Sequence, residues 1–461
     1  MEKSINEFLN ECEDCKEVVI SNNYVNDINY KIIYIIEMVD IRKFNYEIKP
    51  YINKDNINIL DKIYLGLCIR VSDISKSNLE YLLYNGKILL FYNDNYYIFE
   101  FTNRPKRSIS KSSIDPDDES SSQDGLIEDF NTNITLIKRR LKTNNLCVDK
   151  FTLGLITKTD TALLYLKETY NKKMLIKAFE ILNSITTQNI ITINDISILF
   201  QNKELVPKTF LTSSPEIIST SILKGKIVII IDNSPVACII DPTFSTFTTS
   251  KSYVNTPLYY NIFKHIFIII FMFIAIFMMG LFIALINYHT SIIPLPLLVN
   301  IKITERGTSW PMFFEVLIVY FLFEFYRFTT SRSTNNYIQN IIIILGGLFI
   351  GQNAIESGTI GATILFLTSI SYIAIFAITN NIYLITSINI FRFFILLMSY
   401  LLGIIGFIVS SLIVILYLFK QKSDSNYYLY PFIPFNLKNF INFFKPNNMK
   451  ETSKWKKLLL F

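Results

Sequence analysis

Residues 311–361 read PMFFEVLIVYFLFEFYRFTTSRSTNNYIQNIIIILGGLFIGQNAIESGTIG, and this stretch decides how the chain is organised. Its first part is apolar except for three ionisable residues, Glu315, Glu324 and Arg327. An ionisable side chain at the centre of a membrane helix costs roughly 2.5–3.5 kcal/mol on insertion scales, so it usually faces a partner or water. The charges therefore predict that this otherwise apolar segment contacts a polar partner or water.

The second part of the stretch contains three glycines followed by three polar residues: Gly346, Gly347 and Gly351, then Gln352, Asn353 and Glu356. Glycines spaced four apart let two helices approach closely, so we predict that these glycines pack helices together, within one subunit or between subunits. The polar residues end the same predicted helix, where they form either a pore mouth or a solvated loop.

The composition divides the chain into a mixed, charged half before about Tyr253 and an apolar half from Ile262 to Phe419. A transmembrane helix needs about 20 mainly apolar residues. Five segments are candidates: Ile262–Ile286, Pro311–Phe328, Ile338–Ile355, Thr359–Thr379 and Phe393–Phe419. We therefore expect a polytopic membrane protein with four or five apolar helices in contact with membrane lipids.

Both ends of the chain are predicted to be cytoplasmic. The N-terminal run MEKSINEFLNECEDCKEVV lacks the apolar core of a signal peptide. The tail from Lys420 to Phe461 has eight lysines against Asp424 and Glu451, a net charge of +6 that equals the formal charge of the whole protein. Such a tail suits the anionic inner face of a membrane, whereas nucleic-acid binding is disfavoured because nothing else in the chain is basic.

Two cytoplasmic ends require an even number of crossings, so one of the five candidates is predicted not to cross. We assign this role to Pro311–Phe328, which is short and charged. Asn380–Arg392 is predicted to form a short interfacial helix, from which the Arg392 side chain reaches the inner surface.

The cysteines and histidines predict neither a metal nor a cofactor. The five cysteines are scattered, and the only close pair is Cys12 and Cys15. A zinc or redox site needs a second pair or nearby histidines, but the only histidines, His265 and His289, lie beside a candidate span. We expect reduced thiols.

The charged half contains two stretches of the same pattern, residues 82–101 (LLYNGKILLFYNDNYYIFEF) and 222–240 (ILKGKIVIIIDNSPVACII). Aligning Gly86 on Gly225 superposes a strand, a turn and a second strand without a gap. The match predicts two related α/β subdomains; a chance likeness of β-branched runs is the alternative. The expected fold class is an α/β N-terminal region of two such subdomains followed by an all-α polytopic membrane domain. The predicted boundaries are 1–110, 111–255, 256–420 and a basic tail at 421–461.

Helical spacing sorts the charges of residues 311–328 onto two faces. Tyr320, Glu324 and Arg327 share one face, so Glu324 and Arg327 are expected to pair. Glu315 lies about half a turn round from Glu324 at 100° per residue, so it must face another subunit, the membrane interface or water. The alternative is an amphipathic helix at the headgroup level with no transport role. The candidate pore or gating residues are Glu315, Tyr320, Glu324, Arg327, Gln352 and Glu356.

Five runs of sequence, in order, resemble the A subunit of spore germinant receptors, the GerA family of endospore-forming bacteria. These runs are GLIEDFNTNITLIKRRLK (125–142), TKTDTALLYL (157–166), LKGKIVIIIDNSPVACIIDPTFSTF (223–247), PMFFEVLIVYFLFEFYR (311–327) and LGGLFIGQNAIESG (345–358). The chain departs from the family pattern in places. Tyr320 stands where a third carboxylate is expected, and prolines expected near Ser333 and Thr379 are missing. These departures concern details of gating.

The resemblance implies a subunit of a receptor in the spore inner membrane, with a transporter-like B subunit and a lipoprotein C subunit as partners. It also implies a homo-oligomer that conducts cations or transduces the germination signal, and no enzyme activity. Two alternatives stay open within the family: an A-like protein associated with the dipicolinate channel, and a non-conducting scaffold that couples the B subunit to another channel. A secondary transporter is disfavoured because the spans show no recognisable inverted repeat.

Overall fold

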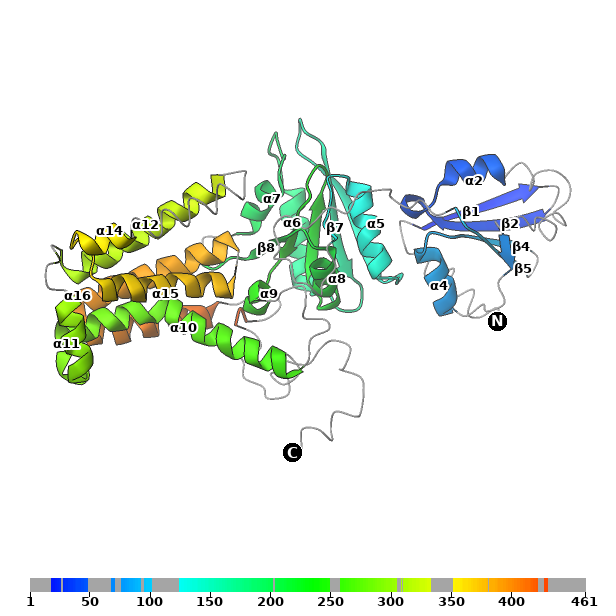
Figure 1. Ribbon diagram of the computed structural model, residues 1–461. Helices are drawn as coiled ribbons and strands as arrows, with labels where there is room; N and C mark the ends of the chain where they lie inside the picture. The colour runs from blue at the N-terminus through cyan, green and yellow to red at the C-terminus, as the bar shows by residue number, and fades with distance from the viewer. Residues whose placement is uncertain are drawn as a thin grey trace. The chain divides into compact units, whose positions relative to one another are not determined.

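The computed structural model in Figure 1 divides the chain into two compact units. One comprises Met1–Lys203 with Lys208–Pro242, and the other comprises Glu204–Pro207 with Thr243–Phe461. The structure describes residues 18–25, 28–48, 68–70, 76–92, 95–101, 124–201, 204–248, 258–304, 308, 310–332, 351–379, 381–421 and 427–429.

The first unit contains two antiparallel five-stranded sheets with the same strand order, β1-β2-β4-β5-β3 and β6-β7-β9-β10-β8. The first sheet comprises β1 (Val18–Val25), β2 (Ile28–Ile35), β3 (Cys68–Arg70), β4 (Ile88–Tyr92) and β5 (Asn95–Phe99), with helices α2 (Ile41–Glu47) and α4 (Lys76–Tyr84). The second comprises β6 (Leu146–Leu153), β7 (Thr159–Leu166), β8 (Thr209–Thr212), β9 (Ile227–Ile231) and β10 (Ala237–Ile240), with helices α5 (Phe130–Arg140), α6 (Lys172–Asn183), α7 (Ile193–Phe200) and α8 (Pro215–Leu223).

The shared strand order confirms the predicted α/β region with two related sheets. Gly86 and Gly225 occupy equivalent turns, each between a helix and the following strand, with φ of 76° and 79° that favour glycine. The gapless match is wrong beyond the first strand, however. Leu90 pairs with Tyr97, seven residues on, whereas its counterpart Ile229 pairs with Cys238, nine residues on. The second hairpin therefore has a turn two residues longer.

Strand β9 is buried along its whole length because helices cover both faces of the second sheet (Figure 1). On one face, Ile227, Ile229 and Ile231 join a core cluster with residues of α6 and α7, among them Met174 and Ile196. On the other face, α5 and α8 pack against the sheet. A continuous run of β-branched residues is what a strand buried on both sides requires.

The second unit is helical. Its elements are α9 (Phe244–Thr248), α10 (Leu258–Tyr288), α11 (Leu295–Thr304), α12 (Met312–Arg332), α14 (Gly351–Glu356), α15 (Ala362–Ile378) and α16 (Ile382–Lys420). Among the described residues, two stretches are long and apolar enough to cross a membrane, Ile262–Tyr288 and Ile382–Lys420; α11 and α15 are apolar but shorter. Positions 338–350 of the predicted span Ile338–Ile355 lie outside the described residues. The all-α character of this region is confirmed.

Helix α16 folds back on itself at Gly403, where φ is 64° and ψ is −138°. The rings of Phe391 and Tyr417 lie 5.7 Å apart between centroids although 26 positions separate them in sequence, so the two arms run antiparallel. The separate interfacial helix predicted for Asn380–Arg392 and the single span Phe393–Phe419 are therefore wrong. Residues 382–402 form one arm, and residues 404–420 return beside it.

The fold-back changes the counting of crossings. Helix α10 runs in the same direction as the first arm, because Gly280 lies against Ile395 and the Tyr288 hydroxyl donates to the Tyr400 carbonyl at 2.8 Å. The beginning of α10 and both ends of α16 thus lie at one end of the bundle. We predicted that Pro311–Phe328 does not cross the membrane because five crossings would separate the two ends of the chain. The hairpin adds a crossing, so this reason no longer applies, and the assignment stays a prediction.

Replacing Gly403 with alanine tests the fold-back. A Cβ at this position would lie 2.9 Å from the Tyr288 ring, and a left-handed conformation costs a non-glycine residue about 1–2 kcal/mol. Gly403→Ala should therefore lower the thermal midpoint of the full chain in detergent, followed by circular dichroism. Ser411→Ala, at a partly exposed position on the second arm, should leave it unchanged. Equal midpoints for both variants would contradict the fold-back.

Candidate functional site

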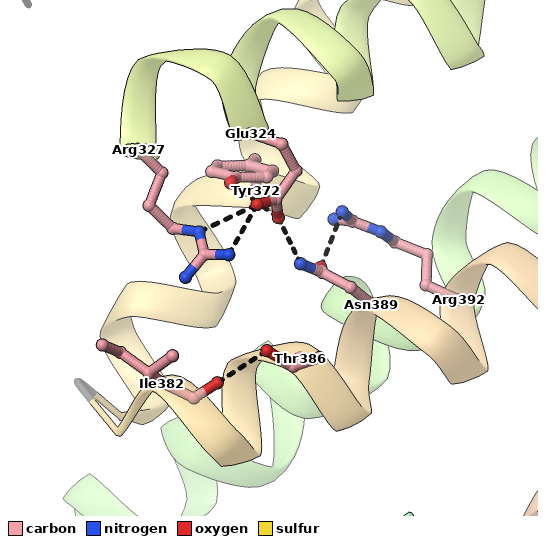
Figure 2. A network of polar contacts seen from close by, with 7 residues as sticks. All are labelled: Glu324, Arg327, Tyr372, Ile382, Thr386, Asn389 and Arg392. Atoms are coloured by element: carbon pink, nitrogen blue, oxygen red, sulfur yellow. Dashed lines mark hydrogen bonds and ion pairs between the residues drawn. The ribbon is translucent and has the colours of Figure 1, made fainter. Parts of the chain in front are cut away.

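The candidate site lies where α12, α15 and α16 pack together. Helix α12 supplies Glu324 and Arg327, α15 supplies Tyr372, and the first arm of α16 supplies Asn389 and Arg392 (Figure 2). Phe323 stacks on Tyr372 with ring centroids 4.7 Å apart, which fixes α12 against α15 next to the charges. Apolar packing thus brings polar groups from three helices to one point.

The Glu324 carboxylate is the centre of this network. Its Oε2 accepts from Arg327 Nε at 2.9 Å and Nη2 at 2.7 Å. Its Oε1 accepts from the Tyr372 hydroxyl at 3.1 Å and from Asn389 Nδ2. The ion pair expected from helical spacing is therefore present, and the same carboxylate also links α12 to α15 and α16. Hydrogen bonds to a charged group are stronger than those between neutral groups.

Arg392 is buried inside the bundle, with 3% of its surface exposed. Its guanidinium carbon lies 3.8 Å from the centroid of the Tyr320 ring and 5.3 Å from that of Tyr372, and its Nη2 donates to Asn389 Oδ1 at 2.8 Å. The prediction that Arg392 reaches the inner membrane surface is therefore wrong. Two aromatic faces and an amide provide the cation with partners inside the bundle.

The charges of this network leave one positive charge uncompensated. Glu324 and Arg327 neutralise each other, so Arg392 contributes a net charge of +1 to the cluster. Its Nη1 is buried and has no hydrogen-bond partner among the described residues. Among the described residues, Arg392 is stabilised by the π faces of Tyr320 and Tyr372 and by the amide oxygen of Asn389.

Glu315 lies apart from this network, in the first turn of α12, and is fully buried. Its Oε2 accepts from the backbone N–H of Gly361 at 2.8 Å, and Gly361 is the N-cap residue of α15. A carboxylate at a helix N-terminus is stabilised by the helix dipole. We predicted that Glu315 faces another subunit, the membrane interface or water. One of its carboxylate oxygens instead binds the N-terminus of α15. The other oxygen, Oε1, has no hydrogen-bond partner within the described part of the chain.

The remaining candidates are more exposed. Gln352 Nε2 donates to Glu356 Oε1 at 2.8 Å on α14, where both side chains are exposed. A Cβ at Gly351 would meet Leu365 at an ordinary 3.6 Å, so close packing does not require glycine there. Gly346 and Gly347 lie outside the described residues. A tighter contact is at Gly280 on α10, where a Cβ would lie 2.6 Å from Ile395.

Tyr372, Asn389 and Gly280 are the residues that sequence reasoning missed. Asn389 stands three positions before Arg392 in an apolar helix, and this spacing was the available signal for a polar pair. Tyr372 and Gly280 carry no local signal, because each acts through a partner far away in sequence.

The described residues offer neither a metal-ligand set nor an activated thiol. Among the described residues, no group of three or more His, Cys, Asp or Glu side chains could hold a metal ion. In the α/β region, burial raises the pKa of the Cys238 thiol to about 12, so this cysteine is inert as a nucleophile. The arrangement can instead bind charge and fix the relative positions of three helices.

Known proteins resemble this chain along most of its length. The family described as Bacillus/Clostridium GerA spore germination protein matches residues 3–457. Spore germination protein XA of Bacillus anthracis is 28% identical over 438 residues, 92% of this chain and 88% of the relative. Spore germination protein KA of Bacillus subtilis (strain 168) is 26% identical over 453 residues, 94% of this chain and 82% of the relative.

A solved structure also resembles part of the chain. It is the crystal structure of the N-terminal domain of the A subunit of the Bacillus megaterium spore germinant receptor GerK3. The likeness covers 52% of this chain and 94% of that domain, with 18% sequence identity and a TM-score of 0.37.

A double-mutant cycle at Glu324 and Arg327 tests the network. Glu324→Gln removes the charge that balances Arg327 and weakens bonds to three helices, so it should lower the free energy of unfolding by about 1–3 kcal/mol. Arg327→Gln in the same background should cost less than it does alone, because its partner is already neutral. Chemical unfolding in detergent micelles measures both. Strictly additive effects would show that the pair is not coupled.

Proposed function

Because the chain belongs to the Bacillus/Clostridium GerA spore germination protein family, we propose that it is the A subunit of a spore germinant receptor. In this proposal it resides in the spore inner membrane and assembles with a transporter-like B subunit and a lipoprotein C subunit. It has no enzymatic role. The observation that carries the proposal is the family match across nearly the whole chain, joined to a charged cluster inside an apolar helical bundle.

The proposed topology has the α/β region and the basic tail in the cytoplasm. Two features support it. The beginning of α10 and both ends of α16 lie at one end of the helical bundle. The lysine-rich tail resists translocation and suits the anionic inner leaflet. The α16 hairpin then enters and leaves the membrane from the cytoplasmic side.

We propose that copies of the subunit assemble into an oligomer that conducts cations, with different carboxylates in different roles. Glu315 and Glu324 are engaged within one chain, by Gly361 and by Arg327, Tyr372 and Asn389, so their role is to position helices and gate the pore. Glu356 is exposed on α14, where repeated copies would form a ring that concentrates cations at the pore mouth.

The alternative is a non-conducting scaffold that passes the signal from the B subunit to another channel. It is favoured by the observation that the carboxylates of Glu315 and Glu324 are already engaged within the chain. Purified protein in liposomes separates the two: a conducting oligomer releases trapped cations, whereas a scaffold passes none even when oligomeric. The other alternative is that the protein is associated with the dipicolinate channel. Genes for B and C subunits next to the gene for this chain would argue against that alternative.

Neutralising single carboxylates in spores tests the assignment of roles. Glu356→Gln should slow cation release after germinant addition by about tenfold, because a ring of like charge concentrates counter-ions by that order. Glu324→Gln should change the fraction of spores that respond, because it loosens the helices. Subunit abundance is measured by immunoblot, and Glu180→Gln, an exposed change on α6, is the control. Unchanged release in Glu315→Gln, Glu324→Gln and Glu356→Gln together would refute the assigned roles.

A further inference from the structure

The cluster between α12, α15 and α16 carries more positive than negative charge. Its described residues include two guanidinium groups, Arg327 and Arg392, but one carboxylate, Glu324. The carboxylate forms its ion pair with Arg327 at 2.7 Å. The Asn389 amide separates Glu324 from Arg392, because its nitrogen donates to the first and its oxygen accepts from the second (Figure 2). In the described part of the bundle, Arg392 therefore has no ion-pair partner.

The burial of Arg392 makes this imbalance unfavourable. The residue is 3% exposed, and its guanidinium lies over the ring of Tyr320 and near that of Tyr372. Aromatic faces attract a cation but carry no net charge of their own. A buried charge is stable when it is paired and when its hydrogen-bonding groups are satisfied. The two rings provide neither an opposite charge nor a strong acceptor.

Two hydrogen-bond donors at this point are unused. Arg392 Nη1 is buried without a hydrogen-bond partner among the described residues, and so is the hydroxyl of Tyr320, a residue that is itself 8% exposed. Because the guanidinium lies over the Tyr320 ring, the hydroxyl at the edge of that ring is its neighbour. Buried polar groups are usually paired. A positively charged donor beside a neutral one lacks an acceptor that carries negative charge.

The arrangement of the donors indicates the kind of anion. Arg392 Nη2 already donates to Asn389 Oδ1, so Nη1 and the Tyr320 hydroxyl are the groups left for a ligand. A carboxylate or a phosphate is typically bound by both arms of the guanidinium fork. One arm and a hydroxyl instead suit a small spherical anion. A single negative charge would also make the described cluster neutral.

The cluster is open on one side and closed on the other. The side chains of Glu324 and Arg327 are 34% and 27% exposed, so the network reaches the surface of the bundle next to the buried part. Arg392 and Tyr320 are too deeply buried for a side chain of a second protein to contact them. The neutralising group is therefore an ion small enough to enter beside Glu324.

We propose that Arg392 Nη1 and the Tyr320 hydroxyl form a binding site for a small monovalent anion of the halide class, such as chloride. The anion neutralises Arg392 and stabilises the packing of α12 against the first arm of α16. In this role it is a fixed ligand, distinct from the cations of the proposed conduction. The site does not depend on the receptor function, so purified protein is sufficient to test it.

Thermal unfolding of the full chain in detergent tests the site. Sodium chloride replaces sodium gluconate at constant ionic strength, so that the anion is the only variable. A ligand that binds the folded state raises the midpoint as its concentration increases. The midpoint should therefore rise with chloride, and with bromide in the same way. Arg392→Gln should remove this dependence, whereas Lys302→Gln, which removes an exposed cation from α11, should keep it.

Two changes at Tyr320 test the site even if Arg392→Gln fails to fold. Tyr320→Phe removes one hydrogen bond to a charged ligand, so it should raise the half-saturating chloride concentration about tenfold. Tyr320→Glu places a negative charge beside Arg392, so its midpoint should no longer depend on chloride. Tyr383→Phe, which removes an exposed hydroxyl elsewhere on α16, should behave as the unmodified chain does.

Chloride NMR measures binding directly, because an ion that exchanges with a protein site has a broadened resonance. The unmodified chain should broaden the chloride line more than Arg392→Gln and Tyr320→Glu do. Equal broadening by all three would show binding at the basic surface only and would overturn the proposal. A midpoint of the unmodified chain that is the same in chloride and in gluconate would overturn it as well.

Discussion

The arrangement of the helical unit depends on one constraint: a charge placed among apolar helices must find its partners there. The Glu324 carboxylate meets this constraint with four donors from three helices. Two of these donors, Arg327 Nε and Nη2, lie on α12 itself, whereas Tyr372 and Asn389 lie on α15 and α16 and orient these helices together with apolar packing. Asn389 then orients Arg392. A single acid residue thus links the three helices that pack around it.

Sequence reasoning recovered the features that depend on local spacing. Glu324 and Arg327 are three residues apart, so their pairing follows from helix geometry alone. The partners of Glu315 and Asn389 lie 46 and 65 positions away, and no periodic pattern reports such contacts. The fold-back at Gly403 was missed because one glycine in an apolar run looks like an uninterrupted span. Its positive φ is visible only in the structure.

The two sheets of the α/β region have diverged while they keep one topology. The described residues of the first follow the order strand, strand, helix, strand, helix, strand, strand, and the second has two helices, α6 and α7, where the first has α2. Each has a glycine at the same turn before its fourth strand. A repeated architecture thus provides two similar cores.

The turn of the α16 hairpin has a consequence for how the protein is built into a bilayer. Residues 401–405 read LLGII and contain no polar side chain, so the turn has no need to emerge into water. The Tyr288 hydroxyl satisfies the carbonyl of Tyr400, one of the backbone groups that the turn leaves without a helical partner. In the topology that we propose, such a hairpin would insert as one piece from the cytoplasmic side. The lysine-rich segment that follows it would then not have to cross the hydrocarbon.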